Sequence, residues 1–422
     1  MAILKRRRFV NSILALLLLA ASACSKNRES LPVNEIKNPE TAEIRIAYFG
    51  PGDPSHPIAG GIWQGACMAI EQANRAGGFN GRSLSLVPCW ADNPWSAGVS
   101  QIAKLAFAGD TCAVIGGIDG PTTHLAEQVV VKAQLALVNP ASTDKTVNLA
   151  FVPWAFSCLP DDQAQAPILA DAIVRQLGAA GGFAVLSADD HDSQLFTVEL
   201  LKALGDRNRN PRHHIQLDRN EQDPAPFVQT ILEFPTDSVV LVAAPQTGAH
   251  FLRALRNKGF SGPVFGGPWM GQSLFCELAG PAAEGIVFPL LWTPSPAADR
   301  FTENYRARTG KAPDYLAAQM YDAVTLLSEA IRTSGPDREA LIESLKTLSP
   351  WQGVTGIIQW DRLGRNQRPV LLGTIRNGRI CPFSCPFRKS LLFPRNRRIQ
   401  LLYPIPYILY PALRIFLSPF LR

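Results

Sequence analysis

The sequence lacks most of the short patterns that mark an enzyme or a disulfide-bonded scaffold. Eight cysteines among 422 residues are too few for a disulfide framework. The chain has no G-x-x-x-x-G-K-S/T phosphate loop, no G-x-G-x-x-G after its first expected strand, no G-x-S-x-G and no H-E-x-x-H. None of its six histidines pairs with cysteine or carboxylate at a metal-ligand spacing. We therefore expect no catalysis, no cofactor and no metal, with an exported α/β enzyme as the less favoured alternative.

Acidic residues are missing from both ends of the chain. Residues 1–23 carry four basic side chains and residues 381–422 carry seven, with no Asp or Glu in either segment. Of the total formal charge of +6, residues 24–380 therefore hold −5. A nucleic-acid-binding domain would show its basic residues in the folded body, so we expect no nucleic-acid partner.

The N-terminus has the three parts of an export signal. Basic residues at 5–8 precede an apolar run at 9–19, and small residues follow up to Cys24. The apolar run is short for a transmembrane helix. The small residues before Cys24 are typical of a bacterial lipoprotein signal, so we expect residues 1–23 to be a signal peptide and Cys24 to be lipidated. Plain secretion and an uncleaved anchor are the alternatives. Residues 24–42 read as a flexible tether.

Apolar runs and amphipathic stretches alternate along the body of the chain. Ile44–Phe49 is a strand candidate, and Ile62, Ala66 and Ala73 lie on one face of the helix that follows. Further strands are expected near 84, 113, 135, 183, 239, 264 and 286, with the spacing that strand–helix–strand units need. The fold class is therefore α/β, with parallel sheets covered on both faces. His213 and His214 stand in a polar segment, which predicts a solvated loop.

The order of the segments resembles that of a known family. The residues that carry the resemblance are Ile44–Gly52, the helix Gly61–Asn74 running into Arg75–Arg82, Ala113–Gly117 with Thr122 and Thr123, Leu137–Thr143, Phe156–Ala164, Tyr321–Ala323 and Gly353–Asp361. In this order they resemble the branched-chain amino-acid-type extracellular solute-binding proteins of ABC transporters, which have the type I periplasmic-binding fold. The resemblance covers residues 43–380.

The resemblance implies two Rossmann-like lobes joined by a three-crossing hinge. The first lobe would comprise residues 43–157 and 291–352, and the second residues 158–290 and 353–380. A small solute (an amino acid, an amide or an organic acid) would bind in the cleft, and the closed form would deliver it to ABC permease subunits. The protein would be periplasmic or on the cell surface, held to the membrane through Cys24. A ligand-sensing lipoprotein that feeds a signalling partner is the alternative on the same fold.

Two loops of the first lobe are candidates for solute contact. In parallel α/β sheets ligands bind beyond the carboxyl ends of the strands, where helix N-termini offer free N–H groups. Gly120 N–H and the Thr122 hydroxyl could hold a carboxylate, or Thr122 could simply cap a helix. By the family pattern, a second loop offers a backbone carbonyl and a hydroxyl. Its residues are Ala141, Ser142 and Thr143.

The candidates outside these two loops depart from the usual amino-acid-binding pattern. His191 stands where relatives often have a tyrosine, and Trp269 stands where they tend to have a glutamate that pairs with the ligand ammonium. These departures favour an apolar or aromatic ligand over an α-amino acid, although either side chain could instead belong to its own lobe. Asp161 or Asp162 could replace the ammonium partner. Ser55 and His56, in the first cleft loop, are lesser candidates.

The chain ends on an atypical basic, proline-rich segment. Residues 381–422 hold seven prolines, and prolines break the apolar run that follows Arg397 and Arg398, so a transmembrane helix is not expected. The abrupt change of composition suggests a frame-shifted reading of the normal ending. A basic segment that binds the membrane surface is the alternative.

Overall fold

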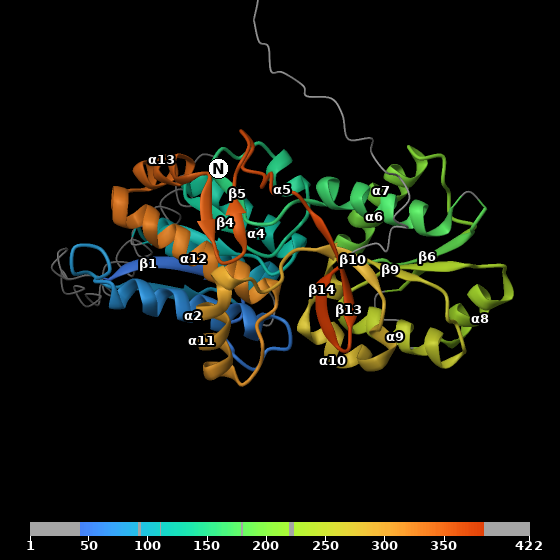
Figure 1. Cartoon of the computed structure of the whole chain (residues 1–422). Coiled ribbons are helices and arrows are strands. Elements are labelled where there is room, and N and C mark those ends of the chain that lie inside the picture. The colour runs from blue at the N-terminus through green and yellow to red at the C-terminus, as the bar shows by residue number, and fades with distance from the viewer. Residues whose placement is uncertain (1–42, 92–93, 110, 179, 219–222, 384–422) are drawn as a thin grey trace, which may run out of the picture. The chain divides into compact units, whose positions relative to one another are not determined.

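A computed structural model describes residues 43–91, 94–109, 111–178, 180–218 and 223–383 (Figure 1). The expected signal peptide, the tether, Cys24 and nearly all of the basic tail lie outside the described residues. None of the helices in the described ranges is both long and apolar enough to cross a membrane.

The first sheet contains five parallel strands in the order β2-β1-β3-β4-β5. They are β1 (Ile44–Phe49), β2 (Leu84–Pro88), β3 (Thr111–Gly116), β4 (Ala136–Asn139) and β5 (Ala155–Ser157). Ile46 of β1 lies opposite Leu86 on one side and Ala113 on the other. All residues of β3 and β4 are buried, as expected for parallel strands covered by helices on both faces.

The second sheet has seven strands in the order β14-β13-β10-β9-β8-β6-β7. They are β6 (Phe183–Ala188), β7 (His213–Leu217), β8 (Ser238–Val242), β9 (Val264–Gly266), β10 (Val287–Leu290), β13 (Leu371–Arg376) and β14 (Arg379–Pro382). Strands β6 to β10 are parallel, whereas β13 and β14 run antiparallel. Asn377 and Gly378 join them with φ values of 51° and 70°, the left-handed pair that a tight hairpin turn favours.

Helices connect the strands. They are α2 (Ala59–Arg75), α3 (Val99–Ala108), α4 (Gly120–Ala133), α5 (Thr146–Leu149), α6 (Asp162–Leu177), α7 (His191–Gly205), α8 (Ala225–Glu233), α9 (Pro245–Asn257), α10 (Ser273–Ala279), α11 (Asp299–Thr309), α12 (Tyr315–Ser334) and α13 (Arg338–Leu348). The short turns are η1 (Pro94–Gly98), η2 (Pro268–Gly271), η3 (Gly280–Ala283) and η4 (Pro296–Ala298), and a small hairpin joins β11 (Trp351–Gly353) to β12 (Gly356–Ile358).

Each sheet has its own apolar core, and these cores define two lobes. The first lobe packs β1, α2 and the orange α12 together, and the second packs β6, β8 and α9 (Figure 1). Ile358 is fully buried in the core of the first lobe. The sequence expectation assigned this residue to the second lobe. The core of the first lobe thus continues beyond the expected boundary at residue 352.

The structure confirms the α/β class and the expected strands, but it corrects one local prediction. The prediction that His213 and His214 form a solvated loop is wrong, because both lie on β7. The ring of His213 stacks on Phe234 at 3.9 Å between centroids, and His214 Nε2 lies 2.7 Å from Ser187 Oγ. β7 is the edge strand of its sheet, so its outer residues can be polar and the apolar run used to recognise strands is absent.

A buried carboxyl group on α12 binds the turn of the hairpin formed by β11 and β12. Asp322 is 1 % exposed and accepts hydrogen bonds from Val354 N (2.8 Å), Thr355 N (2.7 Å) and Thr355 Oγ1 (2.6 Å). Burial raises the pKa of Asp322 to about 6, although these donors and Arg368 oppose the change. The folded protein therefore holds a proton on Asp322 at pH values where the unfolded chain has released it.

We predict that adding a methyl group at the close contact between α2 and α12 is costly. A Cβ on Gly65 would lie 2.3 Å from the Ala317 carbonyl oxygen, so Gly65→Ala should lower the free energy of unfolding by about 1–3 kcal/mol. Gly205, at the end of α7, has open space around it, and Gly205→Ala should be neutral or slightly stabilising. Urea unfolding measures both. Equal stability of the two variants would contradict the close packing of these helices.

We also predict a pH dependence that Asp322 causes. Its folded pKa lies above its unfolded value, so its contribution to stability is full below about pH 4 and is lost as the pH rises through 6. Between pH 4 and 7 the protein should lose on the order of 3 kcal/mol relative to Asp322→Asn, whose side chain does not titrate. Unfolding curves of both proteins across this range measure the difference. Parallel pH profiles would show that folding does not raise the pKa of Asp322.

Candidate ligand-binding site

The first candidate loop connects the end of β3 to the start of α4. Asp119 caps α4: its carboxylate accepts from Thr122 N at 2.9 Å and from the Thr122 hydroxyl at 2.5 Å. The Thr122 Oγ1 also accepts from Ile118 N at 3.0 Å. The sequence left open that Thr122 itself caps the helix, and this is wrong: Asp119 is the N-cap, and Thr122 is the third helical residue of a capping box, which satisfies its hydroxyl within the loop.

The backbone N–H of Gly120, which has no partner within α4, donates to a carboxyl group of the other lobe. Gly120 N donates to Asp192 Oδ1 at 3.1 Å and to Asp192 Oδ2 at 3.2 Å. Asp192 is the second residue of α7, so the protein's own carboxylate lies at the N-terminus of α4, where the sequence predicts a solute carboxylate. Contact of Gly120 and Thr122 with a solute stays a prediction.

The second candidate loop follows β4 and is buried. The Asn139 side chain accepts from Ala141 N (3.2 Å) and Ser142 N (2.9 Å), which fixes the start of the loop. The Thr143 carbonyl accepts from Asp162 N at 2.9 Å and so joins the loop to the start of α6. Ala141, Ser142 and Thr143 are all at most 9 % exposed. Their contact with a solute stays a prediction.

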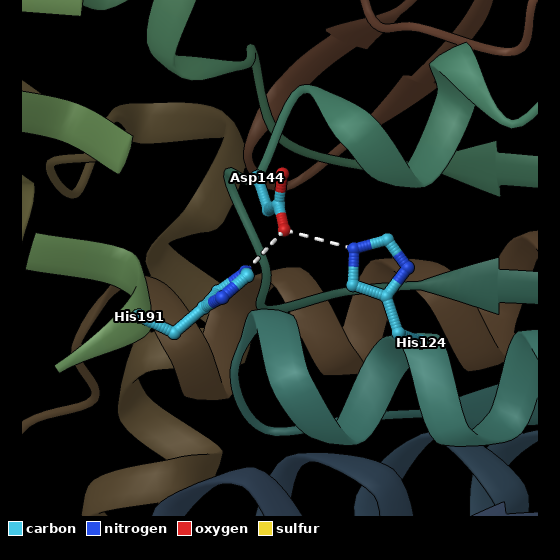
Figure 2. Close-up of side chains that lie close together, drawn as sticks. All are labelled: His124, Asp144 and His191. Atoms are coloured by element: carbon cyan, nitrogen blue, oxygen red, sulfur yellow. Dashed lines mark hydrogen bonds and ion pairs between the residues drawn. The ribbon is translucent and has the colours of Figure 1, made fainter. Parts of the chain in front are cut away.

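Asp144, the next residue of this loop, forms hydrogen bonds with two histidines. Asp144 Oδ2 lies 2.9 Å from His124 Nε2 on α4 and 2.8 Å from His191 Nε2 on α7 (Figure 2). Asp144 Oδ1 accepts from Thr146 N and from the Thr146 hydroxyl at the start of α5. His124 Nδ1 lies 2.9 Å from Glu127 Oε2, one turn along α4. We call His124, Asp144 and His191 the Asp144 cluster; it joins the two lobes.

The carboxylates of Asp144 and Glu127 favour positive charge on His124. Hydrogen bonds to Asp144 and Glu127 raise the pKa of His124 to about 9, against the effect of burial. Burial alone would raise the pKa of Asp144, but hydrogen bonds from His124, Thr146 and His191 outweigh it and lower that pKa. At neutral pH the cluster therefore combines a carboxylate with a protonated imidazole.

Two further acids lie beside the Asp144 cluster and are destabilised as anions. Burial and the charge of Asp119 raise the pKa of Asp192 to about 8, although Gly120 N–H opposes this. Asp162 is 2 % exposed, and burial raises its pKa well above the usual range. Asp162 Oδ1 is also a buried oxygen with no hydrogen-bond partner among the described residues. At neutral pH both side chains therefore favour the protonated, uncharged form.

A charged pair provides a second connection between the lobes. Lys145, directly after Asp144, forms an ion pair with Glu199 of α7. Glu199 is buried, and the Lys145 side chain is only 21 % exposed. Removing one partner of such a pair leaves a poorly solvated charge, so the pair fixes how α7 lies against this loop.

The remaining sequence candidates lie apart from the Asp144 cluster or have local roles. Asp161 caps α6 through Ala164 N at 3.0 Å and has Arg365 3.7 Å away. The Trp269 ring packs edge-to-face on Phe196 of its own lobe, with centroids 5.8 Å apart. This is the role within its own lobe that the sequence left open for Trp269.

Ser55 and His56 line a cavity of about 480 Å³ between the first-lobe helices and α10. Gln272 and Asp314 line it too, but no member of the Asp144 cluster does. His56 Nδ1 accepts from Ala59 N at 3.0 Å, so this histidine also orders the start of α2.

Sequence reasoning found one member of the Asp144 cluster and missed two. His124 and Asp144 are 20 residues apart, and His191 follows 47 residues after Asp144, so no short motif connects them. A signal was available all the same. His124 follows the Thr122–Thr123 loop and Asp144 follows Thr143, so both adjoin loops already predicted to face the cleft.

The comparisons with known proteins agree with this architecture. A family model described as periplasmic binding protein matches residues 43–379. A leucine-, isoleucine-, valine-, threonine- and alanine-binding protein of Pseudomonas aeruginosa is 23 % identical over 328 residues, which cover 76 % of this chain and 86 % of that protein. BasB, a chemotactic signal transduction system substrate-binding protein of Halobacterium salinarum, is 27 % identical over 235 residues, covering 54 % of this chain and 55 % of that protein.

A solved structure has the same fold. It is the branched-chain amino acid transporter substrate binding protein of Streptococcus pneumoniae in complex with isoleucine. It superposes with a TM-score of 0.73 at 20 % identity, over 80 % of this chain and 98 % of that one. Together with the family match over nearly all described residues, this establishes that the chain belongs to the periplasmic binding protein family, among relatives of the branched-chain amino-acid type.

Proposed function

We propose that the protein is the solute-binding lipoprotein of an ABC importer. It captures a small amino-acid-like or carboxylate solute between its two lobes by hinge closure and performs no chemistry on it. The proposal rests on one observation: loops that follow strands in both lobes converge. The loops after β3, β4 and β6 converge on the Asp144 cluster, which is the edge where parallel α/β sheets bind ligands.

The connections between the lobes have the form of a hinge. Three segments pass between the lobes, near Cys158, near Leu291 and near Asn366. Asn366 Nδ2 donates to the Cys158 carbonyl at 2.6 Å, and Arg368 donates to the Leu291 carbonyl at 2.8 Å. Because the three segments are held together by hydrogen bonds, small backbone rotations within them can move one lobe against the other without breaking either core.

The solute is best sought among organic acids and amides as well as amino acids. The relative from Pseudomonas aeruginosa is named for leucine, isoleucine, valine, threonine and alanine, and the Streptococcus pneumoniae structure holds isoleucine. In this chain Trp269 replaces the glutamate expected to pair with an ammonium, and Asp192 lies at the N–H of Gly120. These differences support a solute of another chemical class than the amino acids for which those relatives are named.

Export and anchoring follow from the N-terminal pattern. Lys5–Arg8, the apolar run and Cys24 are the basis for placing the mature protein outside the cytoplasm, attached through a lipid on Cys24. At least two acyl chains are needed for stable attachment, since a single chain binds a membrane only marginally.

Sensing is the second candidate function. The Halobacterium salinarum relative is named as part of a chemotactic signal transduction system, although it aligns over only 54 % of this chain. Both functions need the same solute capture, and they differ in the partner protein that recognises the closed form. Co-purification from native membranes with permease subunits supports import, whereas co-purification with a transducer supports sensing.

We predict that one chemical class of solute stabilises the protein in a thermal-shift screen of amino acids, amides, aliphatic acids and aromatic acids. A ligand that binds only the folded state adds about 2.7 kcal/mol at 100 times its dissociation constant. Thr143→Ala and Trp269→Ala should reduce the shift, and His250→Ala, on the exposed side of α9, should leave it unchanged. A screen without any shift would contradict solute capture.

We further predict that Asp192 competes with carboxylate solutes for the start of α4. Asp192→Ala removes the acceptor from Gly120 N–H, so acetate or propionate should stabilise this variant more than the natural protein. Asp206→Ala removes a carboxyl group at the exposed far end of α7 and serves as the control. If acetate shifts the melting temperature of all three proteins equally, Asp192 does not occupy the anion position.

A further inference from the structure

We propose that the Asp144 cluster binds one divalent transition-metal ion of the zinc class between the two lobes. The ion would leave at least one coordination position open for the carboxylate of a solute. The inference rests on the proposed function for the location of the cleft, and it deepens that function by making the captured solute a metal-bound acid. Two imidazole nitrogens and one carboxylate oxygen form the donor set, which suits zinc and its neighbours rather than magnesium or calcium.

The donor atoms already converge. The ligand atoms of His124, Asp144 and His191 all lie within 4.8 Å of one another, and both histidine Nε2 atoms approach the same oxygen, Asp144 Oδ2 (Figure 2). Bonds of about 2.0–2.1 Å in a tetrahedral arrangement separate neighbouring donors by about 3.3 Å. The contacts of 2.9 and 2.8 Å to Asp144 Oδ2 need to lengthen by about half an ångström, and the two Nε2 atoms, which lie within 4.8 Å of each other, need to sit at the same spacing to share an ion.

The surrounding residues orient these donors as in a built metal site. Glu127 Oε2 holds Nδ1 of His124 and leaves Nε2 directed at Asp144, the carboxylate–histidine arrangement that supports metal ligands. Thr146 holds Oδ1 of Asp144 and leaves Oδ2 for the two histidines. Asp144 is fully buried, whereas the His191 and His124 side chains are 41 % and 29 % exposed. An ion can thus enter from the imidazole side, where its open position would face the solute.

Further carboxyl groups surround the Asp144 cluster. Asp119, Asp162 and Asp192 lie close enough to interact electrostatically with one another or with Asp144. The nearby cation Lys145 is already paired with Glu199. Buried oxygens of Glu127 and Asp162 have no hydrogen-bond partner among the described residues. A metal ion at the cluster would supply positive charge to these oxygens and to the carboxylate of a solute.

The first experiment measures metal binding alone. The full chain is purified without a histidine tag, treated with EDTA, exchanged into buffer, and titrated with Zn²⁺ or Mg²⁺ by calorimetry. We expect one Zn²⁺ site that discriminates strongly against Mg²⁺. Glu127→Gln should weaken Zn²⁺ binding by about 10–100-fold, and His124→Gln or His191→Gln by more. His250→Gln should bind as the natural chain does.

The variants distinguish Zn²⁺ binding at the Asp144 cluster from Zn²⁺ binding at free cysteine thiols. Cys67 and Cys276 are partly exposed and could bind Zn²⁺, but every variant keeps them, so only the Asp144 cluster differs. His191→Gln removes a partly exposed side chain and is expected to fold, which circular dichroism checks. The absence of Zn²⁺ binding, or the same affinity in His124→Gln, His191→Gln and the natural chain, would overturn the proposal.

The second experiment repeats the solute screen in EDTA and with saturating Zn²⁺. Acids that bind at least tenfold more tightly with Zn²⁺, and lose this gain in His191→Gln, support the proposal. Solutes that bind equally in both buffers would leave the proposed function standing and overturn the role of the metal. If neither Zn²⁺ nor any solute binds, both the proposed function and this inference fail.

Discussion

The two oxygens of the Asp144 carboxylate perform different tasks, and the arrangement of the cleft depends on this division. Oδ1 caps α5 through Thr146, so the carboxylate cannot rotate freely. Oδ2 then faces His124 of its own lobe and His191 of the other. A single buried charge thereby fixes the end of a loop in the first lobe and the start of a helix in the second. Because the carboxylate is fully buried, losing either histidine would leave part of its charge uncompensated.

The N-termini of α4 and α7 contact each other across the two lobes, and this contact explains the position of Asp192. Gly120 opens α4 with an N–H that has no partner in its own helix, and such groups attract anions. Asp192, in the first turn of α7, supplies one from across the cleft. The contact satisfies Gly120 but brings Asp192 close to Asp119, and burial and this proximity raise the pKa of Asp192. The carboxyl group of Asp192 thus occupies the anion position of α4, and at neutral pH its protonated form is favoured.

The sequence predicted the fold closely because burial leaves a strong pattern. Ile44–Phe49 matches β1 residue for residue, and the helix expected at Gly61–Asn74 is α2, Ala59–Arg75. The edge strand β7 was missed because a strand with one neighbour need not be apolar. Gly120 and Thr143 were predicted to contact a solute because loops after strands face the cleft, and that contact stays a prediction. Asp144 and His124 were missed because their proximity to His191 arises from the packing of α4 against α7, which no local spacing encodes.

Closing the two lobes brings their carboxyl groups close together. Asp144 and Asp119 come from the first lobe and Asp192 from the second, and burial together with this proximity raises the pKa of Asp192 to about 8. At neutral pH a proton on Asp192 therefore relieves part of the repulsion between the lobes, and protonated His124 offsets part of the negative charge that remains. At the proposed metal site a bound cation would offset more, and a solute that brings negative charge alone would lack that compensation.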